Sequence, residues 1–411
     1  MLNAVTRQIE IYQSMFGQKL TKGALTVVAI GFVVMFVGGG SRHAIGLVLK
    51  PMAETFGWER SALGGTVALF LVVTALCMYF AGHLADRVSV RAVLGGGFFV
   101  SALGIGLMAL VTETWHAYLL YGVAFAAGNG VASIIPIGVM VSRQFPDKVG
   151  LANSMAISGM GLGQLVIISA LTAVLIAVGW GSVFMWLGLV NLMMVPVVLW
   201  MIREEPKDPT EESGPAGDGL SIGEAMKTRH FWLLTAVYAL CGFHDFFAST
   251  HLVAFALDQQ IAPLFAGNLL AFMGLAGLVG VLASGAWSDR FSPVSATMIC
   301  HIIRMAIFAM ILVNKDPVAV AAFAMLFGFT FWITAPLAVV FVRNAFGARN
   351  LGALSGLITC VHHMCGGLGA WIGAALFDAD GSYDRAFVVM LVCSVAAVLL
   401  SLGLRRGDQQ A

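Results

Sequence analysis

Long runs of apolar residues, interrupted by short polar stretches, make up almost the whole of this chain. Each run suits a helix of roughly 20 residues, which is the length that crosses the hydrocarbon core of a bilayer. The runs and the Gly, Pro and charged residues between them predict about twelve such helices. We expect them at 23–49, 58–81, 91–111, 115–142, 150–177, 180–202, 231–257, 264–286, 294–313, 316–342, 350–376 and 384–404. The pattern therefore predicts an all-α membrane protein.

One long polar stretch divides the chain into two parts. Residues 203–230, between the sixth and seventh expected helices, are rich in Glu, Lys, Pro and Gly, which is typical of a loop. We therefore expect two six-helix bundles, at 23–202 and 231–404, joined by this loop. Residues 1–22 and 405–411 are expected to form a leading segment and a tail on the same side of the membrane as the loop.

The two bundles share a short motif at matching positions. Gly82–Arg87 reads GHLADR after the second helix, and Gly285–Arg290 reads GAWSDR after the eighth. Asp86 and Asp289 within these motifs are 203 positions apart. A repeat at this spacing indicates that one six-helix unit has been duplicated, so the two bundles should be pseudo-symmetric.

Composition narrows the class of protein. Hydrophobic residues make up 59% of the chain and charged residues only 10%, whereas a soluble domain carries about 25% charged residues. The formal net charge of +1 and the lack of a Lys/Arg tract argue against nucleic-acid binding. No H-E-x-x-H or P-loop pattern is present, so we expect neither an enzyme nor a bound cofactor. All six cysteines lie in apolar segments and are expected to be buried, unpaired side chains.

The distribution of positive charge predicts the orientation in the membrane. Most of the 22 Lys and Arg residues lie before the first helix, in the even-numbered loops and after the last helix. The odd-numbered loops hold only Lys50, Arg60, Lys315 and Arg385. Because loops rich in Lys and Arg stay in the cytoplasm, both termini are expected there.

These features together resemble the major facilitator superfamily, because the G-x-x-x-D-R motif follows both the second and the eighth helix of a duplicated twelve-helix chain. Within it, Gly46–Pro51 followed by Phe56–Ser61, the stretch Thr250–Leu252, and Phe377–Asp378 are similar to the bacterial monocarboxylate and oxalate/formate branch. The resemblance implies a secondary transporter of the bacterial inner membrane that works by alternating access, as a symporter or an antiporter. It also implies that the first, fourth, seventh and tenth helices line a central cavity.

The resemblance implies a gate at the cytoplasmic ends of the second and eighth helices. Asp86 and Asp289 would lie near helix amino termini of the opposite bundle, where a carboxylate is favoured, and Arg87 and Arg290 would accompany them. The alternative is that the arginines only mark the cytoplasmic side.

Arg42 is a charge stranded in the first helix, directly after Gly38–Ser41. An arginine at this depth costs about 2.5–3.5 kcal/mol on insertion scales and therefore usually faces a partner or a cavity. Its planar guanidinium suits a carboxylate, and animal monocarboxylate carriers have a lysine at or near this place. We therefore predict that Arg42 binds an anionic substrate; a purely structural ion pair, or a side chain that snorkels to the surface, is the alternative.

Asp245, in the seventh helix, is separated from Arg42 by the same 203 positions as the repeat. The two charges therefore occupy matching places in the two bundles, and we expect them to pair when the cavity is empty. A substrate carboxylate would compete with Asp245, and protonation of Asp245 would release the arginine, which couples proton to substrate. The alternative is a static bridge that holds the bundles together.

Several histidines and uncharged polar residues accompany these charges. His43, His251 and His363 are predicted to contact substrate, and His251 to carry protons as well, whereas packing is the preferred interpretation for His244 and His362. Asn129 and Trp332 are added to the predicted pocket on weaker grounds, because polar residues in lipid often serve only to join helices. The run from Cys360 to Cys365 offers metal-binding residues, but on a helix they point in several directions, so no metal is expected.

Arg304 lies in the middle of the ninth helix, and we expect it to be paired within the second bundle. The eighth helix lacks the arginine, and the eleventh the lysine, of the carriers that this chain resembles, which favours a monocarboxylate over a dicarboxylate. The predicted function is therefore transport of a small organic anion by a monomer in the bilayer, with protons as coupling ions. The alternatives are a carboxylate antiporter, an exporter of drugs or other metabolites, and a channel or sensor.

Overall fold

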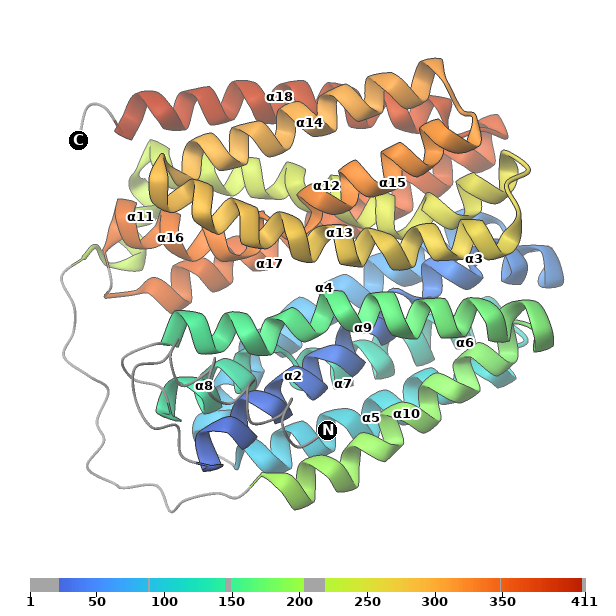
Figure 1. The fold of residues 1–411 in the computed structure, drawn as a ribbon, viewed down its shortest axis with the longest axis horizontal. Coiled ribbons are helices and arrows are strands. Elements are labelled where there is room, and N and C mark those ends of the chain that lie inside the picture. Colours follow the sequence, from blue (N-terminus) through green and yellow to red (C-terminus); the bar gives the residue numbers. More distant parts are fainter. Residues whose placement is uncertain (1–21, 88, 145–148, 203–218, 348, 409–411) are drawn as a thin grey trace, which may run out of the picture.

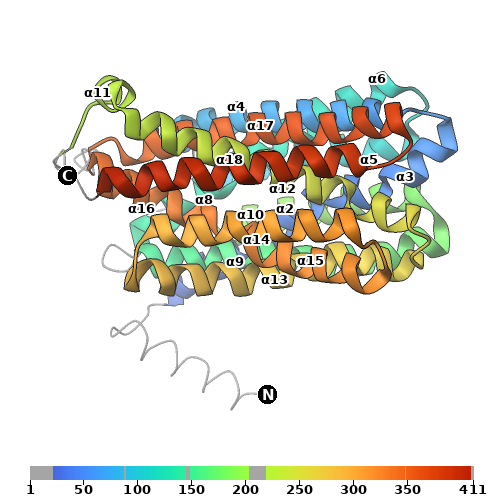
Figure 2. The same cartoon turned by 90° about the horizontal axis from the view of Figure 1, so that it is seen from above.

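The computed structural model describes residues 22–87, 89–144, 149–202, 219–347 and 349–408, and the regular secondary structure within them is helical apart from one isolated bridge between Gly219 and Gly347. The helices run roughly along one common axis (Figures 1 and 2). The first group comprises α2 (Lys22–Arg42), α3 (Ala44–Phe56), α4 (Arg60–Arg87), α5 (Val90–Leu107), α6 (Thr114–Ala117), the π-helical segment η2 (Tyr118–Phe125), α7 (Ala126–Val131), α8 (Ile134–Gln144), α9 (Val149–Val178) and α10 (Trp180–Met201). The second comprises α11 (Ile222–Lys227), α12 (Arg229–Asp258), α13 (Pro263–Arg290), α14 (Pro293–Val313), α15 (Pro317–Phe331), α16 (Thr334–Phe346), α17 (Leu351–Asp380) and α18 (Asp384–Asp408).

Within the described part of the chain, 11 helical segments are long and apolar enough to cross a membrane. The tenth expected crossing is not among them because it is divided between α15 and α16, of which α15 is itself apolar but short. The expected all-α membrane fold is therefore confirmed, but three crossings that were expected as single helices are interrupted.

Two of the interruptions have the same cause. The fourth crossing breaks between Val131 and Ile134, and the tenth between Phe331 and Thr334. A proline follows each break, at Pro136 and Pro336, and a proline ring clashes with the carbonyl four residues earlier and offers no N–H. The affected carbonyls therefore fall inside the two breaks, at equivalent places in the repeat. A proline inside a helix kinks or breaks it, and before Pro336 the helix is broken completely.

The first crossing is interrupted at His43, between α2 and α3. The interruption follows three consecutive glycines, Gly38 to Gly40, and an ideal Cβ at Gly39 or Gly40 would lie within 3.0 Å of α9. The absence of side chains here lets α2 and α9 approach closely, and it places Arg42 at the end of a helix segment.

Equivalent helices pack in equivalent ways in the two groups. Within the amino-terminal half (α2–α10) α2 packs on α9 and α5 on α10, and within the carboxyl-terminal half (α11–α18) α12 packs on α17 and α14 on α18. The two halves meet chiefly where α4 lies beside α17 and α9 beside α13 (Figure 2). These are the second, fifth, eighth and eleventh crossings, so the arrangement has the pseudo-symmetry that the repeated motif predicts.

The buried apolar side chains show how the halves are joined. We call the end with the connections 57–59, 259–262 and 381–383 the distal end, and the opposite end, where α12 begins and α10 ends, the proximal end. Towards the distal end the described core residues form one cluster shared by both halves. Towards the proximal end they form two clusters, one in each half. The halves are therefore packed together at the distal end.

Candidate functional site

Arg42 lies beside a small cavity between the two halves. The cavity is lined from the amino-terminal half by α2, α3, α4 and η2 and from the carboxyl-terminal half by α12. Its lining residues are Arg42, His43, Ile45, Val67, Phe70, Leu71, Tyr121, Phe246, Ser249 and Thr250. Apart from the arginine and a few hydrogen-bonding groups, the lining is aromatic and aliphatic. A cationic group thus faces a mainly apolar cavity near the middle of the molecule.

The guanidinium of Arg42 is held by its surroundings rather than by a carboxylate. Its Cζ atom lies 5.3 Å from the centre of the Phe246 ring, within range of a cation–π interaction. The Tyr121 hydroxyl donates a hydrogen bond of 2.9 Å to the Arg42 carbonyl, which fixes the backbone where α2 ends. Among the described residues, no carboxylate lies within 4.0 Å of the Arg42 side chain. Its N–H groups are therefore available to donate hydrogen bonds to an anion.

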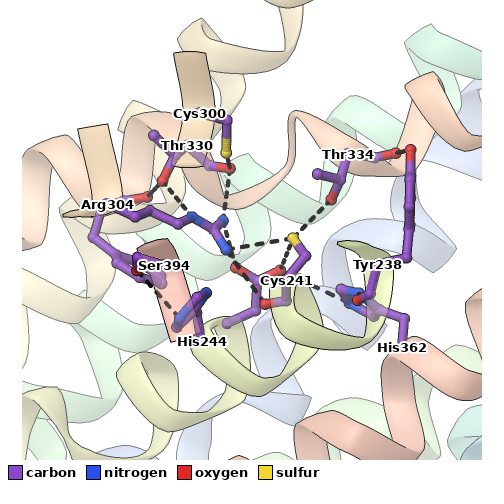
Figure 3. Close-up of polar contacts among 11 residues, drawn as sticks. Tyr238, Cys241, His244, Cys300, Arg304, Thr330, Thr334, His362 and Ser394 are labelled. Carbon is purple, nitrogen blue, oxygen red and sulfur yellow. Dashed lines mark hydrogen bonds and ion pairs between the residues drawn. The ribbon is translucent and has the colours of Figure 1, made fainter. Parts of the chain in front are cut away.

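Asp245 does not pair with Arg42, so the ion pair expected from the repeat spacing is wrong for this conformation. Its Oδ1 atom lies 2.6 Å from Nη2 of Arg304, and both side chains are almost completely buried. Figure 3 shows the Arg304 guanidinium between Thr330 and Cys241. Arg304 belongs to the same half as Asp245, and it reaches the carboxylate from α14. Matching positions in a duplicated fold place two helices symmetrically, but the partner of a side chain depends on which neighbour it faces.

The pairing of Arg304 within the second half is confirmed, and the break in the tenth crossing completes it. Its Nε donates to the Thr330 hydroxyl at 3.0 Å and its Nη2 to the Thr330 carbonyl at 2.9 Å. Thr330 lies in the last turn of α15, where carbonyls have no partner within the helix. A further N–H donates to the Cys241 carbonyl at 3.3 Å. The helix end therefore supplies acceptors for a guanidinium that is fully buried.

The second carboxylate oxygen of Asp245 faces Cys241 and His362. The Cys241 thiol donates to Oδ2 at 3.3 Å, and Nε2 of His362 lies 3.8 Å from the same oxygen. The three donor atoms are close enough to hold a metal ion. However, Arg304 occupies the other carboxylate oxygen and also lies 3.3 Å from the Cys241 sulfur, so a metal cation would face an existing positive charge. The donor set does not fit a metal ion, and the expectation of none stays a prediction.

Four of the residues predicted to contact substrate lie near one another. His43 lines the Arg42 cavity, and its ring centre is 6.2 Å from that of Trp332. His363 packs against the ring of Phe246 at 5.5 Å, and Arg42 lies over the same ring. Helix breaks position two of the four, because His43 lies between α2 and α3 and Trp332 between α15 and α16.

Two buried nitrogen atoms near this cavity have no hydrogen-bond partner among the described residues. They are Nε2 of His43 and Nε1 of Trp332. A buried nitrogen without a partner costs about 1–3 kcal/mol, so such groups usually have one. The His43 nitrogen belongs to a residue that lines the cavity, whereas Trp332 belongs to the other half and packs beside Gly277 of α13.

The remaining predicted site residues lie elsewhere. Asn129 is half-buried in α7, with its amide nitrogen near Gly38. His251 is nearer the distal end of α12, bonded to Tyr383 and the Ala370 carbonyl rather than facing Arg42. Of the predicted gate, Arg290 is exposed and lies over the Phe291 ring. The side chains of Asp86, Arg87 and Asp289 lie outside the described residues.

Sequence reasoning missed several residues of the site. Tyr121, Phe246 and Cys241 are apolar or weakly polar residues in apolar segments, and nothing in the local pattern distinguishes them from core residues. The one available signal was position, because Cys241 and Phe246 lie one turn and one residue from Asp245 on the same helix.

Comparison with known proteins agrees with this architecture. A family model described as Major Facilitator Superfamily matches residues 31–260 and 237–410. Among solved structures, a bacterial homologue of the human lysosomal transporter Spinster, in an inward-facing and unoccupied conformation, superposes with a TM-score of 0.76 at 14% identity, covering 94% of this chain and 98% of that one. The nucleoside transporter NupG gives a TM-score of 0.70 at 13% identity, covering 94% and 99%.

Curated relatives are similar over most of the chain. The uncharacterized MFS-type transporter YcxA of Bacillus subtilis (strain 168) is 23% identical over 378 residues, covering 89% of this chain and 91% of its own. Monocarboxylate transporter 13 of Bos taurus is 28% identical over 300 residues, covering 72% and 69%. The oxalate:formate antiporter of Oxalobacter formigenes is 24% identical over 382 residues, covering 90% and 89%.

Proposed function

Because this chain belongs to the Major Facilitator Superfamily, we propose that it is a secondary transporter of a small organic anion, a monocarboxylate, driven by protons. The relatives named for monocarboxylates and for oxalate and formate support an organic anion as the substrate. The fold supports alternating access, in which two duplicated bundles rock about a site near the middle of the membrane.

The observation that carries the proposal is the environment of Arg42. A guanidinium lies beside a cavity between the halves, and among the described residues no carboxylate neutralises it. In a membrane such a charge is expensive unless an anion or water meets it. Two parallel N–H donors match the geometry of one carboxylate. We therefore assign the substrate carboxylate to Arg42.

The rest of the cavity indicates a small, mainly apolar substrate. Phe70, Tyr121 and Phe246 surround the space next to Arg42 and leave little room for a second charged group. The unpartnered nitrogens of His43 and Trp332 can meet a polar atom of the substrate. His363 and Asn129 complete the proposed pocket as flanking groups. This arrangement favours one carboxylate per molecule over two.

We assign the coupling proton to Asp245 and His362. Nδ1 of His362 lies 3.1 Å from the Tyr238 carbonyl, which can only accept, so Nδ1 is the donor. A neutral His362 then turns the lone pair of Nε2 towards Oδ2 of Asp245, and a proton between the two removes this repulsion. Proton binding there adds one positive charge near Arg42, which favours binding of an anion. The proton-carrying role predicted for His251 is not part of this assignment, since its ring nitrogens both have partners.

We place the protein in the bacterial inner membrane, as a monomer with both termini in the cytoplasm. The Lys and Arg distribution supports this orientation, which makes the proximal end cytoplasmic. Asp86, Arg87, Asp289 and Arg290 are then proposed to close the cytoplasmic side. A carboxylate antiporter is the second candidate, favoured by the similarity to the oxalate:formate antiporter. An exporter of drugs or other metabolites would be favoured by transport of uncharged or cationic compounds.

Purified protein in proteoliposomes tests the proposal. Uptake of labelled short monocarboxylates, dicarboxylates and cations is measured with and without an inward proton gradient, and with and without internal carboxylate. We expect proton-stimulated uptake of monocarboxylates; strict dependence on internal carboxylate would instead identify an antiporter. Transport of no carboxylate would overturn the proposal.

The binding role of Arg42 is tested in the same assay. Loss of a charge-assisted hydrogen bond of about 1.5–3 kcal/mol predicts that Arg42→Gln binds substrate about ten to a hundred times more weakly. Arg385→Gln is the matched control, because Arg385 is exposed and pairs with Asp380 at 3.0 Å within one half. Unchanged transport by Arg42→Gln would remove Arg42 from the site.

A further inference from the structure

The amino end of α4 is capped by the other half of the protein. The backbone N–H groups of Arg60 and Ser61 donate to the two carboxylate oxygens of Asp378, at 3.0 Å and 2.7 Å. The first N–H groups of a helix have no partner within the helix, and the helix dipole favours a negative charge there. Such a cap usually comes from the residue before the helix. Here it comes from α17, 318 positions away.

The side chain of Arg60 is clamped by the same half. Its Nη1 and Nη2 atoms bind the two oxygens of Asp258, the last residue of α12, at 2.6 Å and 2.9 Å. Lys50, on α3, adds a second cation at 2.8 Å from Asp258. The two-pronged geometry is the strong form of an arginine–carboxylate pair, and Arg60 is largely buried. One carboxylate thus joins two helices of the opposite half.

Two aromatic side chains complete the clamp. The Arg60 guanidinium lies 3.7 Å from the centre of the Phe377 ring, and its Nη1 also donates to the Tyr383 hydroxyl at 2.9 Å. Both aromatic residues belong to the carboxyl-terminal half. Arg60 is therefore held by the ends of α12 and α17 and by the connection to α18.

The hydrogen bonds of Tyr383 show where this assembly can separate. His251 Nε2 lies 2.8 Å from the Ala370 carbonyl and must donate to it, so Nδ1 accepts from the Tyr383 hydroxyl at 3.0 Å. These bonds stay within the carboxyl-terminal half. If Arg60 leaves, Tyr383 keeps its acceptor on His251, and the polar contacts that break here among the described residues are those of Lys50, Arg60 and Ser61.

We propose that Asp378 and Asp258, bound to the amino end of α4 and to Arg60, form the gate that closes the distal side of the transport path. These contacts break as a unit when the halves separate at that end and re-form when they close. The apolar core that both halves share at the distal end, and the separate cores at the proximal end, belong to the same state, in which the distal end is closed. The gate concerns the motion of the halves, and therefore holds for any substrate.

The distance between the halves at the distal end tests the gate. Spin labels are introduced through an unnatural amino acid at Leu110 and Val313, which are exposed at the distal ends of opposite halves, so that the native cysteines stay in place. Distances are measured without substrate in lipid nanodiscs by double electron–electron resonance. The Asp258→Asn/Asp378→Asn variant is expected to gain a population at longer distance than the unsubstituted protein.

Asp380→Asn is the matched control. Asp380 lies two positions after Asp378, and it pairs with Arg385 of its own half, so this variant should keep the short distance. Arg60→Asp should open the distal end, and Arg60→Asp/Asp258→Arg should restore part of the short distance. An unchanged distance in the double asparagine variant, eluting as a single species on size exclusion, would overturn the gate, as would equal opening by Asp380→Asn. Because no transport is measured, this result does not depend on which substrate is carried.

Discussion

Nη2 of Arg304 lies 2.6 Å from Oδ1 of Asp245, and the arginine is fully buried while the carboxylate is 5% exposed. Water therefore does not reach the arginine. The other oxygen of the carboxylate faces Cys241 and His362. Arg304 also uses the carbonyl and hydroxyl of Thr330, so only one of its bonds depends on Asp245. This asymmetry means that a proton can bind between Asp245 and His362 while Arg304 stays in place.

Losing either Asp245 or Arg304 alone should destabilise the protein more than losing both residues together. Removing one partner of a buried pair leaves an uncompensated charge, which typically costs about 3–5 kcal/mol, whereas removing both costs much less. We therefore expect Asp245→Ala to lower the melting temperature of the detergent-solubilised protein strongly, and Asp245→Ala/Arg304→Leu to recover most of the loss. Fluorescence-detected size exclusion after heating measures both. A double variant less stable than Asp245→Ala would contradict this account.

The sequence was sufficient to predict what depends on local patterns. Twelve apolar runs and the repeated G-x-x-x-D-R motif are enough for the duplicated membrane fold, because crossing length and motif spacing need no knowledge of contacts. The internal pairing of Arg304 was predicted because a charge in mid-helix needs a partner. The breaks after Val131 and Phe331 could also be predicted from the prolines that follow them, Pro136 and Pro336.

Partners that are remote in sequence could not be predicted. Asp245 was assigned to Arg42 by symmetry, yet the direction of each side chain is set by packing against α14, which the spacing does not encode. Asp378 begins an acidic run, Asp378–Asp384, whose composition is typical of a solvated loop, whereas the structure places it in the last turn of α17. Its real partners are backbone N–H groups of α4, which carry no sequence signal at all.

Neutralising Asp245 without removing it should uncouple protons from substrate. Asp245→Asn keeps the size and one oxygen acceptor for Arg304, but it can no longer take up a proton. We expect exchange of substrate across the membrane to persist and accumulation driven by a proton gradient to be lost. Counterflow and gradient-driven uptake in the same proteoliposomes separate the two. Accumulation at the unsubstituted rate would exclude Asp245 as the proton site, with Asp380→Asn as the exposed control.

Replacing His43 should weaken transport without lowering stability. His43→Leu removes a buried polar atom that has no hydrogen-bond partner among the described residues, so the melting temperature should stay the same or rise. If the nitrogen meets substrate, the KM for uptake should increase at least several-fold. His244→Leu is the comparison, because its Nε2 is 3.0 Å from the Met390 carbonyl and its loss should lower stability. Unchanged KM in His43→Leu would assign His43 to packing.

A side chain at position 46 should separate the halves at the distal end even when the gate formed by Arg60, Asp258 and Asp378 is intact. An ideal Cβ at this position would lie 2.3 Å from the Ser249 carbonyl oxygen of the other half, closer than real atoms approach, and backbone is the obstacle. Gly46→Ala should therefore push α3 and α12 apart and lengthen the distance between labels at Leu110 and Val313. Gly96→Ala is the matched control, since nothing lies within 4 Å of a Cβ there. Because alanine also favours helix by about 1 kcal/mol over glycine, the control isolates the steric effect from helix propensity. If Gly46→Ala keeps the short distance, the contact between α3 and α12 is not what sets closure, and the gate at Arg60 acts alone.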